Sequence, residues 1–142
     1  MAYHLSVFLE NTPGKLEKIT KILAENKINL RAMSLASSGD FGVMKLLVDD
    51  PEKAFTVLKQ NKITATKRQI IAVVVENVPG SFSSLLTNLS SNDINIEDCY
   101  GFLLSDGKTA AIVLEIENYP DTEKYLTQKG FNVLNSQQIY EY

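Results

Sequence analysis

The stretch ENTPG at residues 10–14 returns as ENVPG at residues 76–80, which lies 66 positions further along the 142-residue chain. Carrying this offset from residues 10–33 to residues 76–99 gives eight identities in twenty-four positions. A repeat of this length that occurs twice is too long for a solenoid unit and fits two copies of a small domain. The sequence therefore predicts two domains, residues 1–68 and residues 69–142, each with its own core.

Composition and charge exclude several classes of protein. A hydrophobic content of 44% and a charged content of 22% are usual for a globular protein. The net charge of −3 provides no basic field for phosphate backbones, so we expect no nucleic-acid partner. A single cysteine excludes an internal disulfide framework and a multi-cysteine metal cage, which fits a reducing compartment.

The distribution of apolar residues argues against a membrane protein. No apolar run approaches the roughly 20 residues that a helix needs to cross a bilayer. The first residues lack the basic and apolar regions of a signal peptide. We therefore expect a cytoplasmic protein with no membrane partner.

Hydrophobic periodicity gives each half the order strand, helix, strand, strand, helix, strand. The linker at residues 67–69 is short, and the first hairpin loop should have four to six residues. Pro51 and Pro120 lie 69 apart, which predicts about three extra residues around the second hairpin. In the first half we predict strands at 4–10, 28–36, 43–48 and 63–68 and helices from 13 and 51; in the second, strands at 70–76, 94–103, 110–116 and 131–139 and helices at 79–91 and after 120.

This order predicts an α+β fold. A βαββαβ unit forms a four-stranded antiparallel sheet with both helices on one face, the ferredoxin-like arrangement. We expect two such units packed side by side. Inward-facing residues of the second half should include Phe82, Leu85, Leu86 and Leu89 on its first helix, and Cys99 should be a small buried apolar residue.

The Pro-Gly corners have chemistry that suits a carboxylate. We expect Pro13 to occupy the first helical position, with Asn11 or Thr12 capping the amides behind it. The unpaired amides of a helix N-terminus and the helix dipole favour an anion. The structural alternative is a helix start without a ligand.

Asn29 and Asn95 open the second strand of each repeat. Their side-chain amides both donate and accept hydrogen bonds, and a free amino acid needs donors for its carboxylate and acceptors for its ammonium. A helix of about thirteen residues is ~20 Å long, so Asn29 cannot reach the Gly14 end of its own domain. The two would meet only across an interface between domains. The alternative role for these asparagines is turn formation.

The phrase Asn-x-Pro-Gly at a strand-to-helix turn, followed by Ile-Asn-Leu or Ile-Asn-Ile at the start of the second strand, resembles the ACT domain. The ACT domain is the small-ligand-binding regulatory module of amino-acid metabolism. The resemblance covers essentially the whole chain as two copies, as in small stand-alone tandem ACT proteins. It implies ligand pockets at a seam between domains.

The resemblance also implies which residues bind a ligand. In the serine-regulated phosphoglycerate dehydrogenase, a similar module holds its effector through the loop Asn and the strand-start Asn. A histidine precedes the loop there, whereas Leu9 and Val75 stand here, so serine is not implied. The expected ligand-binding residues are Asn11, Thr12, Pro13, Gly14, Asn29, Leu30, Asn77, Val78, Pro79, Gly80, Asn95 and Ile96.

We expect a regulatory module that binds a free amino acid and modulates a separate enzyme of amino-acid metabolism. A homodimer is expected, with no cofactor and no metal. The alternative function is a ligand-free dimerisation or docking module. An enzyme is disfavoured, because His4 and Cys99 lie far apart in sequence and nothing resembles a nucleophile elbow, a phosphate loop or a metal box.

Overall fold

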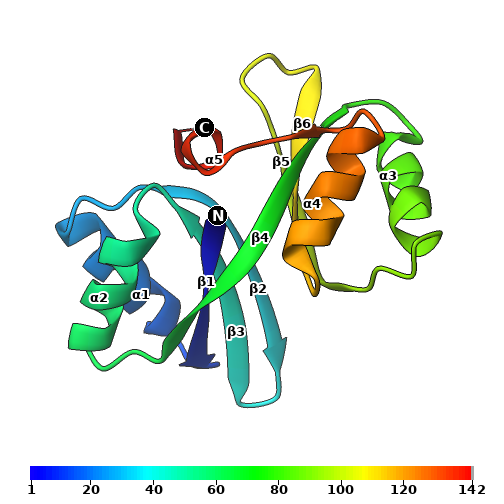
Figure 1. The fold of residues 1–142 in the computed structure, drawn as a ribbon. Helices are drawn as coiled ribbons and strands as arrows, with labels where there is room; N and C mark the ends of the chain where they lie inside the picture. The colour runs from blue at the N-terminus through cyan, green and yellow to red at the C-terminus, as the bar shows by residue number, and fades with distance from the viewer. Residues whose placement is uncertain (142) are drawn as a thin grey trace. The chain divides into compact units, whose positions relative to one another are not determined.

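The computed structural model describes residues 1–141, so Tyr142, the last residue of the predicted second domain, lies outside the described part. The chain folds into two compact units (Figure 1). One contains residues 3–68 with residue 141, and the other contains residues 1–2 with residues 69–140. That the chain divides between residues 68 and 69 into two domains that fold independently stays a prediction.

The first unit has the predicted ferredoxin-like architecture. Its strands lie in the order β2-β3-β1-β4, and β3 pairs antiparallel with both β1 and β2. Helices α1 and α2 cover one face of this sheet (Figure 1). The elements are β1 (Ala2–Glu10), α1 (Lys15–Glu25), β2 (Leu30–Ser38), β3 (Phe41–Val48), α2 (Pro51–Gln60) and the first residues of β4 (Ala65–Glu76).

The second unit repeats this arrangement. Strand β4 lies between β6 and β7, and β5 lies at the far side of β6, so the order is β7-β4-β6-β5. The α+β fold class with ferredoxin-like repeats is therefore confirmed. The further elements are α3 (Ser81–Ser90), β5 (Ile96–Leu103), β6 (Thr109–Ile116), α4 (Tyr119–Gln128), β7 (Asn132–Val133) and α5 (Ser136–Glu141).

The core of each unit lies between its sheet and its helices. Leu5, Val7 and Leu9 alternate along β1 with outward residues, and all three are buried against α1 and α2, as their period of two predicts. In the second unit Leu85 and Leu89 of α3 are buried as predicted. Phe82 is not: it lies in the first turn of α3 and is 40% exposed.

The predicted break at residues 67–69 is wrong. Strand β4 runs without interruption through these residues. None of Lys67, Arg68 and Gln69 has the Gly, Pro or Asn chemistry that reverses a chain. The Lys67 ammonium also donates to both carboxylate oxygens of Glu52 on α2, at 2.8 and 3.0 Å, which holds this part of the strand against the first unit.

The predicted last strand, residues 131–139, is also wrong. Strand β7 has two residues, and helix α5 follows it. The Asn135 side chain accepts a hydrogen bond from the Gln138 amide, and the Gln138 side chain accepts one from the Asn135 amide, both at 2.9 Å. This reciprocal pair is a capping box, which starts a helix where hydrophobic alternation alone suggested a strand.

The two hairpins differ in loop length. The first loop consists of Gly39 and Asp40 and is shorter than the predicted four to six residues. Gly39 has φ 62°, and glycine at the first position of a two-residue hairpin is a favoured arrangement. In the second hairpin the Leu104 amide bonds to the Thr109 carbonyl, which leaves the four residues 105–108 as the loop.

The second repeat therefore has two extra residues, where about three were predicted. From the hairpin onward the offset between the repeats is 68: α2 spans residues 51–60 and α4 spans residues 119–128. The offset of 69 between the prolines arises because Pro51 is the first residue of α2 whereas Pro120 is the second residue of α4. Residues related by 66 before the hairpin and by 68 after it are called counterparts below.

Candidate functional site

The first Pro-Gly corner is tied to the β2–β3 hairpin. The Asn11 backbone amide donates to the Asp40 carbonyl at 2.8 Å, and its side-chain amide donates to the Gly39 carbonyl at 3.0 Å. Asn11 therefore braces the hairpin and does not cap α1. This corrects the predicted capping role, because the side chain bonds to Gly39, 28 positions away, rather than to the helix.

Helix α1 begins two residues later than predicted. Gly14 is its N-cap, with φ 88°, and Pro13 lies in the turn before it. No side chain in the described part of the chain caps α1. A Cβ placed at Gly14 would meet no described atom within 4 Å, so the corner is open. The Lys15 amide donates to the Thr12 carbonyl at 3.4 Å, and no side chain bonds to the other first-turn amides, which can therefore accept an anion.

The second corner repeats this geometry. Gly80 is the N-cap of α3 with φ 90°, again with open space around it and no side-chain cap. The Asn77 backbone amide donates to the Lys108 carbonyl at 2.8 Å, as Asn11 does to Asp40. The Asn77 side chain is exposed and has no hydrogen-bond partner among residues 1–141. Its amide is therefore available to a ligand, whereas the Asn11 side-chain N–H is already used.

Asp106 supports the hairpin that holds the second corner. Its carboxylate accepts hydrogen bonds from the amides of Lys108 and Thr109 and from the Thr109 hydroxyl, at 2.8 to 3.0 Å. These bonds lower the pKa of the Asp106 carboxyl, with the positive charge of Lys108 acting in the same direction. The second corner therefore rests on a turn stabilised by an ionised carboxylate.

The strand-start asparagines are exposed and differ between the repeats. Asn29 has its backbone amide bonded to the Asp49 carboxylate at 2.9 Å, just before the start of β2. Asn95 instead donates from its side chain to the Glu97 carboxylate at 3.0 Å. The counterpart of Glu97 is Arg31, so this acidic neighbour belongs to the second repeat.

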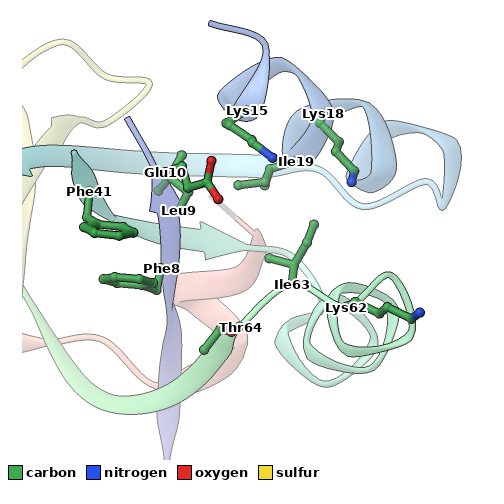
Figure 2. Close-up of a pocket in the computed structure, with 10 residues that line it drawn as sticks. All are labelled: Phe8, Leu9, Glu10, Lys15, Lys18, Ile19, Phe41, Lys62, Ile63 and Thr64. Atoms are coloured by element: carbon green, nitrogen blue, oxygen red, sulfur yellow. The ribbon is translucent and has the colours of Figure 1, made fainter. Parts of the chain in front are cut away.

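A cavity of about 230 Å³ lies beside the first turns of α1 (Figure 2). Lys15, Lys18 and Ile19 line it from α1, and the side chains of Phe8 and Phe41 stack at 5.1 Å between ring centroids. No residue of the first corner and no strand-start asparagine lines this cavity. The remaining lining residues are Leu9, Glu10, Lys62, Ile63 and Thr64.

The histidine and the cysteine are both at least partly shielded from solvent. His4 is fully buried on β1, and no group of three or more His, Cys, Asp or Glu residues within residues 1–141 is placed to hold a metal ion. Cys99 is half-buried, and its pKa is raised by burial and then by the charge of Asp98. Its thiol stays protonated at neutral pH, unlike an activated nucleophile.

Comparison with known proteins places this geometry in a family. Residues 1–141 match the family described as the ACT domain pair. The chain belongs to the ACT domain pair family. A crystal structure of a protein from Bacteroides thetaiotaomicron is similar to this ACT domain pair with a TM-score of 0.93 and 33% identity, over 99% of this chain and 96% of that one. No curated protein sequence matches the chain.

Solved structures with lower identity share the fold of the ACT domain pair. The ligand-free regulatory subunit of aspartate kinase from Thermus thermophilus has a TM-score of 0.66 and 18% identity, over 90% of this chain and 93% of that one. The regulatory subunit from Thermus flavus has a TM-score of 0.58 and 17% identity, over 90% and 93%. Among residues 1–141 of the ACT domain pair, no helix is long and apolar enough to span a membrane.

Two features of the ACT domain pair escaped the sequence analysis. Glu97 has a detectable signal, an acidic residue two positions after a strand-start asparagine and hence on the same side of the strand. The sequence contains no signal for the lysines around the cavity. Lys62 is 47 residues from Lys15, and only the fold brings them to the same cavity.

Proposed function

We propose that this ACT domain pair is a regulatory module that binds a free amino acid between ACT domains and modulates a separate enzyme of amino-acid metabolism. The observation that carries the proposal is the pair of open, uncapped helix starts at Gly14 and Gly80. In a chain of this family, each start presents backbone amides and the positive end of a helix dipole to the carboxylate of the ligand.

The second repeat has the better groups for the two ends of an amino acid. The Asn77 side chain has no partner among residues 1–141 and can bond to the ligand carboxylate. Asn95 bonds through its N–H to Glu97, which leaves its carbonyl oxygen free to accept from a ligand ammonium. The Glu97 carboxylate adds a negative charge at the same place. We therefore assign the stronger ligand contacts to Asn77 and Gly80, with Val78 and Pro79, and to Asn95, with Ile96. The corner and the strand start lie at opposite ends of α3, so each would face a ligand opposite another domain.

The first repeat supplies a weaker site. The Asn11 side-chain N–H is bonded to the Gly39 carbonyl, so its side-chain carbonyl oxygen is what remains for a ligand. Arg31 stands where the second repeat has Glu97. A positive residue next to Asn29 would repel a ligand ammonium. Thr12, Pro13, Gly14 and Leu30 complete the proposed contacts of this repeat.

The regulated partner is proposed to be a separate enzyme. Structural neighbours at TM-scores of 0.66 and 0.58 are named as regulatory subunits of aspartate kinase, which supports a role as a regulatory chain. We further propose a homodimer located in the cytoplasm, because a second chain would add apolar burial that a domain of about 70 residues lacks. Light scattering of the purified chain tests the dimer.

Thermal unfolding in the presence of each of the twenty amino acids tests the proposed function. A ligand at a hundred times its dissociation constant should raise the free energy of unfolding by ~2.7 kcal/mol. Asn77→Ala should remove most of this gain and Asn11→Ala should remove less, with Asn132→Ala, an exposed asparagine on β7, as the matched control. Equal gains in all four proteins would remove the site assignment.

The alternative function is a ligand-free dimerisation or docking module. One observation favours it: Met33 and Leu35 are about 40% exposed on β2, which is an edge strand of the first sheet. Unchanged melting temperatures with all twenty amino acids, together with a dimer that Leu35→Lys dissociates, would support this alternative over ligand binding.

A further inference from the structure

The cavity beside α1 has the size of a small-metabolite site. Its volume of about 230 Å³ lies just below the ~300–1,000 Å³ usual for drug-sized ligands. The end of β1, the first turns of α1 and the connection from Lys62 to Thr64 form its walls, with Phe41 from β3 (Figure 2). None of residues 11–14 lines the cavity, but Glu10 and Lys15 on either side of them do, so the cavity adjoins the proposed amino-acid site.

Three lysines line this cavity, and Figure 2 shows the ammonium of Lys62 directed outward from it. Lys15, Lys18 and Lys62 form no ion pair with any of residues 1–141. Glu10 is the one carboxylate among the lining residues, and it too has no ion-pair partner there. The wall therefore has a net charge of +2 beside the apolar surfaces of Phe8 and Ile63.

Lys15 and Lys18 occupy positions where their charge is unfavourable, and Lys62 has an unusual backbone conformation. Lys15 is the first residue of α1 and Lys18 lies in its first turn, where a positive charge opposes the helix dipole. Lys62 has φ 59°, in the left-handed region that favours glycine. The helix dipole therefore does not account for Lys15 or Lys18, whereas Lys62 follows the C-terminus of α2, where a positive charge is favourable.

The second repeat has neutral residues at the same three places. The counterparts of Lys15 and Lys18 are Ser81 and Ser84 on α3. The counterpart of Lys62 is Gly130, which has φ 87° and donates the same helix-closing hydrogen bond, to the Thr127 carbonyl as Lys62 does to that of Lys59. The stacked Phe8 and Phe41 are likewise replaced, by Val74 and Thr109. Charge and aromatic wall are thus both specific to the first repeat.

We propose that this cavity is a binding site for a small organic dianion with an apolar flank, and that the second repeat has no equivalent site. Lys15 and Lys18 bind the anionic groups, and Lys62 at the rim adds a third ammonium. Phe8 and Ile63 contact the apolar flank. The proposal does not depend on the amino-acid site, although Lys15 lies next to it. Lysine side chains would bind the dianion, whereas backbone amides and asparagine side chains would bind the amino acid.

Nuclear magnetic resonance titration of the ¹⁵N-labelled full chain tests this proposal. The probes are succinate and phenyl phosphate, which distinguish a dicarboxylate from a phosphomonoester, and uncharged succinamide is the control. We expect saturable shifts at the amides of Glu10, Ile19 and Thr64 with at least one dianion, and none with succinamide. The amides of Ser81 and Ser84 should not respond.

Replacing the lysines by the residues of the second repeat sharpens the test. Lys15→Ser/Lys18→Ser should weaken dianion binding about tenfold or more, since two charge-assisted contacts are lost. Lys62→Gly should weaken it less. Both variants should fold at least as stably as the original chain, because the first removes two unfavourable charges and the second relieves an unusual backbone conformation. Lys21→Ser on the exposed side of α1 and Lys27→Gly, which also has a left-handed backbone at φ 57°, are the matched controls.

Glu10→Gln tests whether the charge of the cavity wall controls dianion binding. Removing the one negative charge in the wall should tighten binding of either dianion. Unchanged affinity in Lys15→Ser/Lys18→Ser, or equal loss in the Lys21→Ser and Lys27→Gly controls, would overturn the proposal. Shifts of the same size at the second-repeat amides would overturn it as well. Retained amino-acid stabilisation in these variants would leave the proposed function intact.

Discussion

At the corner of each repeat, one glycine has a backbone conformation that other residues avoid. Gly14 and Gly80 have φ 88° and 90°, and a Cβ at either position would meet no described atom within 4 Å. The need for glycine is therefore conformational and not a matter of space. This explains why the glycine recurs at both corners.

Gly80→Ala should reduce the free energy of unfolding by about 1–2 kcal/mol, because a Cβ is strained at this φ. Chemical denaturation measures the loss. Gly80→Asn is the control and should lose less, since asparagine tolerates the left-handed region. A midpoint for Gly80→Ala equal to that of the original chain would contradict the conformational explanation.

Asp106 gives the second hairpin a dependence on pH. Its folded-state pKa is lowered by hydrogen bonds from Lys108 and Thr109, so the ionised form is stabilised by folding. Its contribution is complete above the ordinary aspartate pKa and is lost as the pH falls through the lowered value.

Titration of the Asp106 carboxyl by nuclear magnetic resonance should therefore give a pKa below that of an unperturbed aspartate. Asp106→Asn should remove this component of the acid sensitivity. An Asp106 pKa at or above that of an aspartate in an unstructured peptide would contradict the hydrogen bonds described here.

Among the elements, α5 depends on side-chain caps rather than on length. It has six residues, and isolated helices of that size are unstable in water. The capping box between Asn135 and Gln138 and the burial of Ile139 hold it in place. Removing the caps should therefore unfold the helix locally.

Asn135→Ala should lower the stability of α5 by about 1 kcal/mol, the usual value of a lost N-cap. Hydrogen exchange of the amides of residues 138–141 measures the local opening. Gln138→Ala should have a similar effect, and the double variant should lose less than the sum, because the two bonds form one motif. Strictly additive losses would show that the two caps act separately.

At the scale of the whole chain, the duplication is preserved in the cores. Leu46 and its counterpart Leu114 are both fully buried, as are Leu58 and Leu126. The sheet registers agree, since Leu5 lies opposite Leu46 and Ile71 lies opposite Leu114. Each unit therefore has its own core built on the same pattern.

Leu46→Ala and Leu114→Ala should each reduce the free energy of unfolding by about 2–5 kcal/mol, the range for a large cavity in a core. Hydrogen exchange should show faster opening of β1 and β3 for the first variant and of β4 and β6 for the second. Leu103→Ala, at a side chain that is 60% exposed, is the control and should change little. Equal effects of the two core variants on every strand would contradict separate cores.

Local patterns in the sequence predicted most of the fold and part of the candidate site. The alternation of Leu5, Val7 and Leu9 and the cap-proline pair at Asp50 and Pro51 depend on neighbours a few residues away, and both predictions are confirmed. Prediction failed where two local signals compete, as at residues 131–139, where alternation favours a strand and the capping box favours a helix.

The sequence by itself determined the duplication, the ferredoxin-like order and the positions of the two Pro-Gly corners, because each is recorded in adjacent residues or in a fixed offset. Tertiary structure alone decided that Asn11 braces a hairpin while the Asn77 side chain stays unpaired. It also decided that Lys62 lies at the same cavity as Lys15 and Lys18. These contacts join segments that are distant in the chain, and their distances are determined only when the sheet and helices pack.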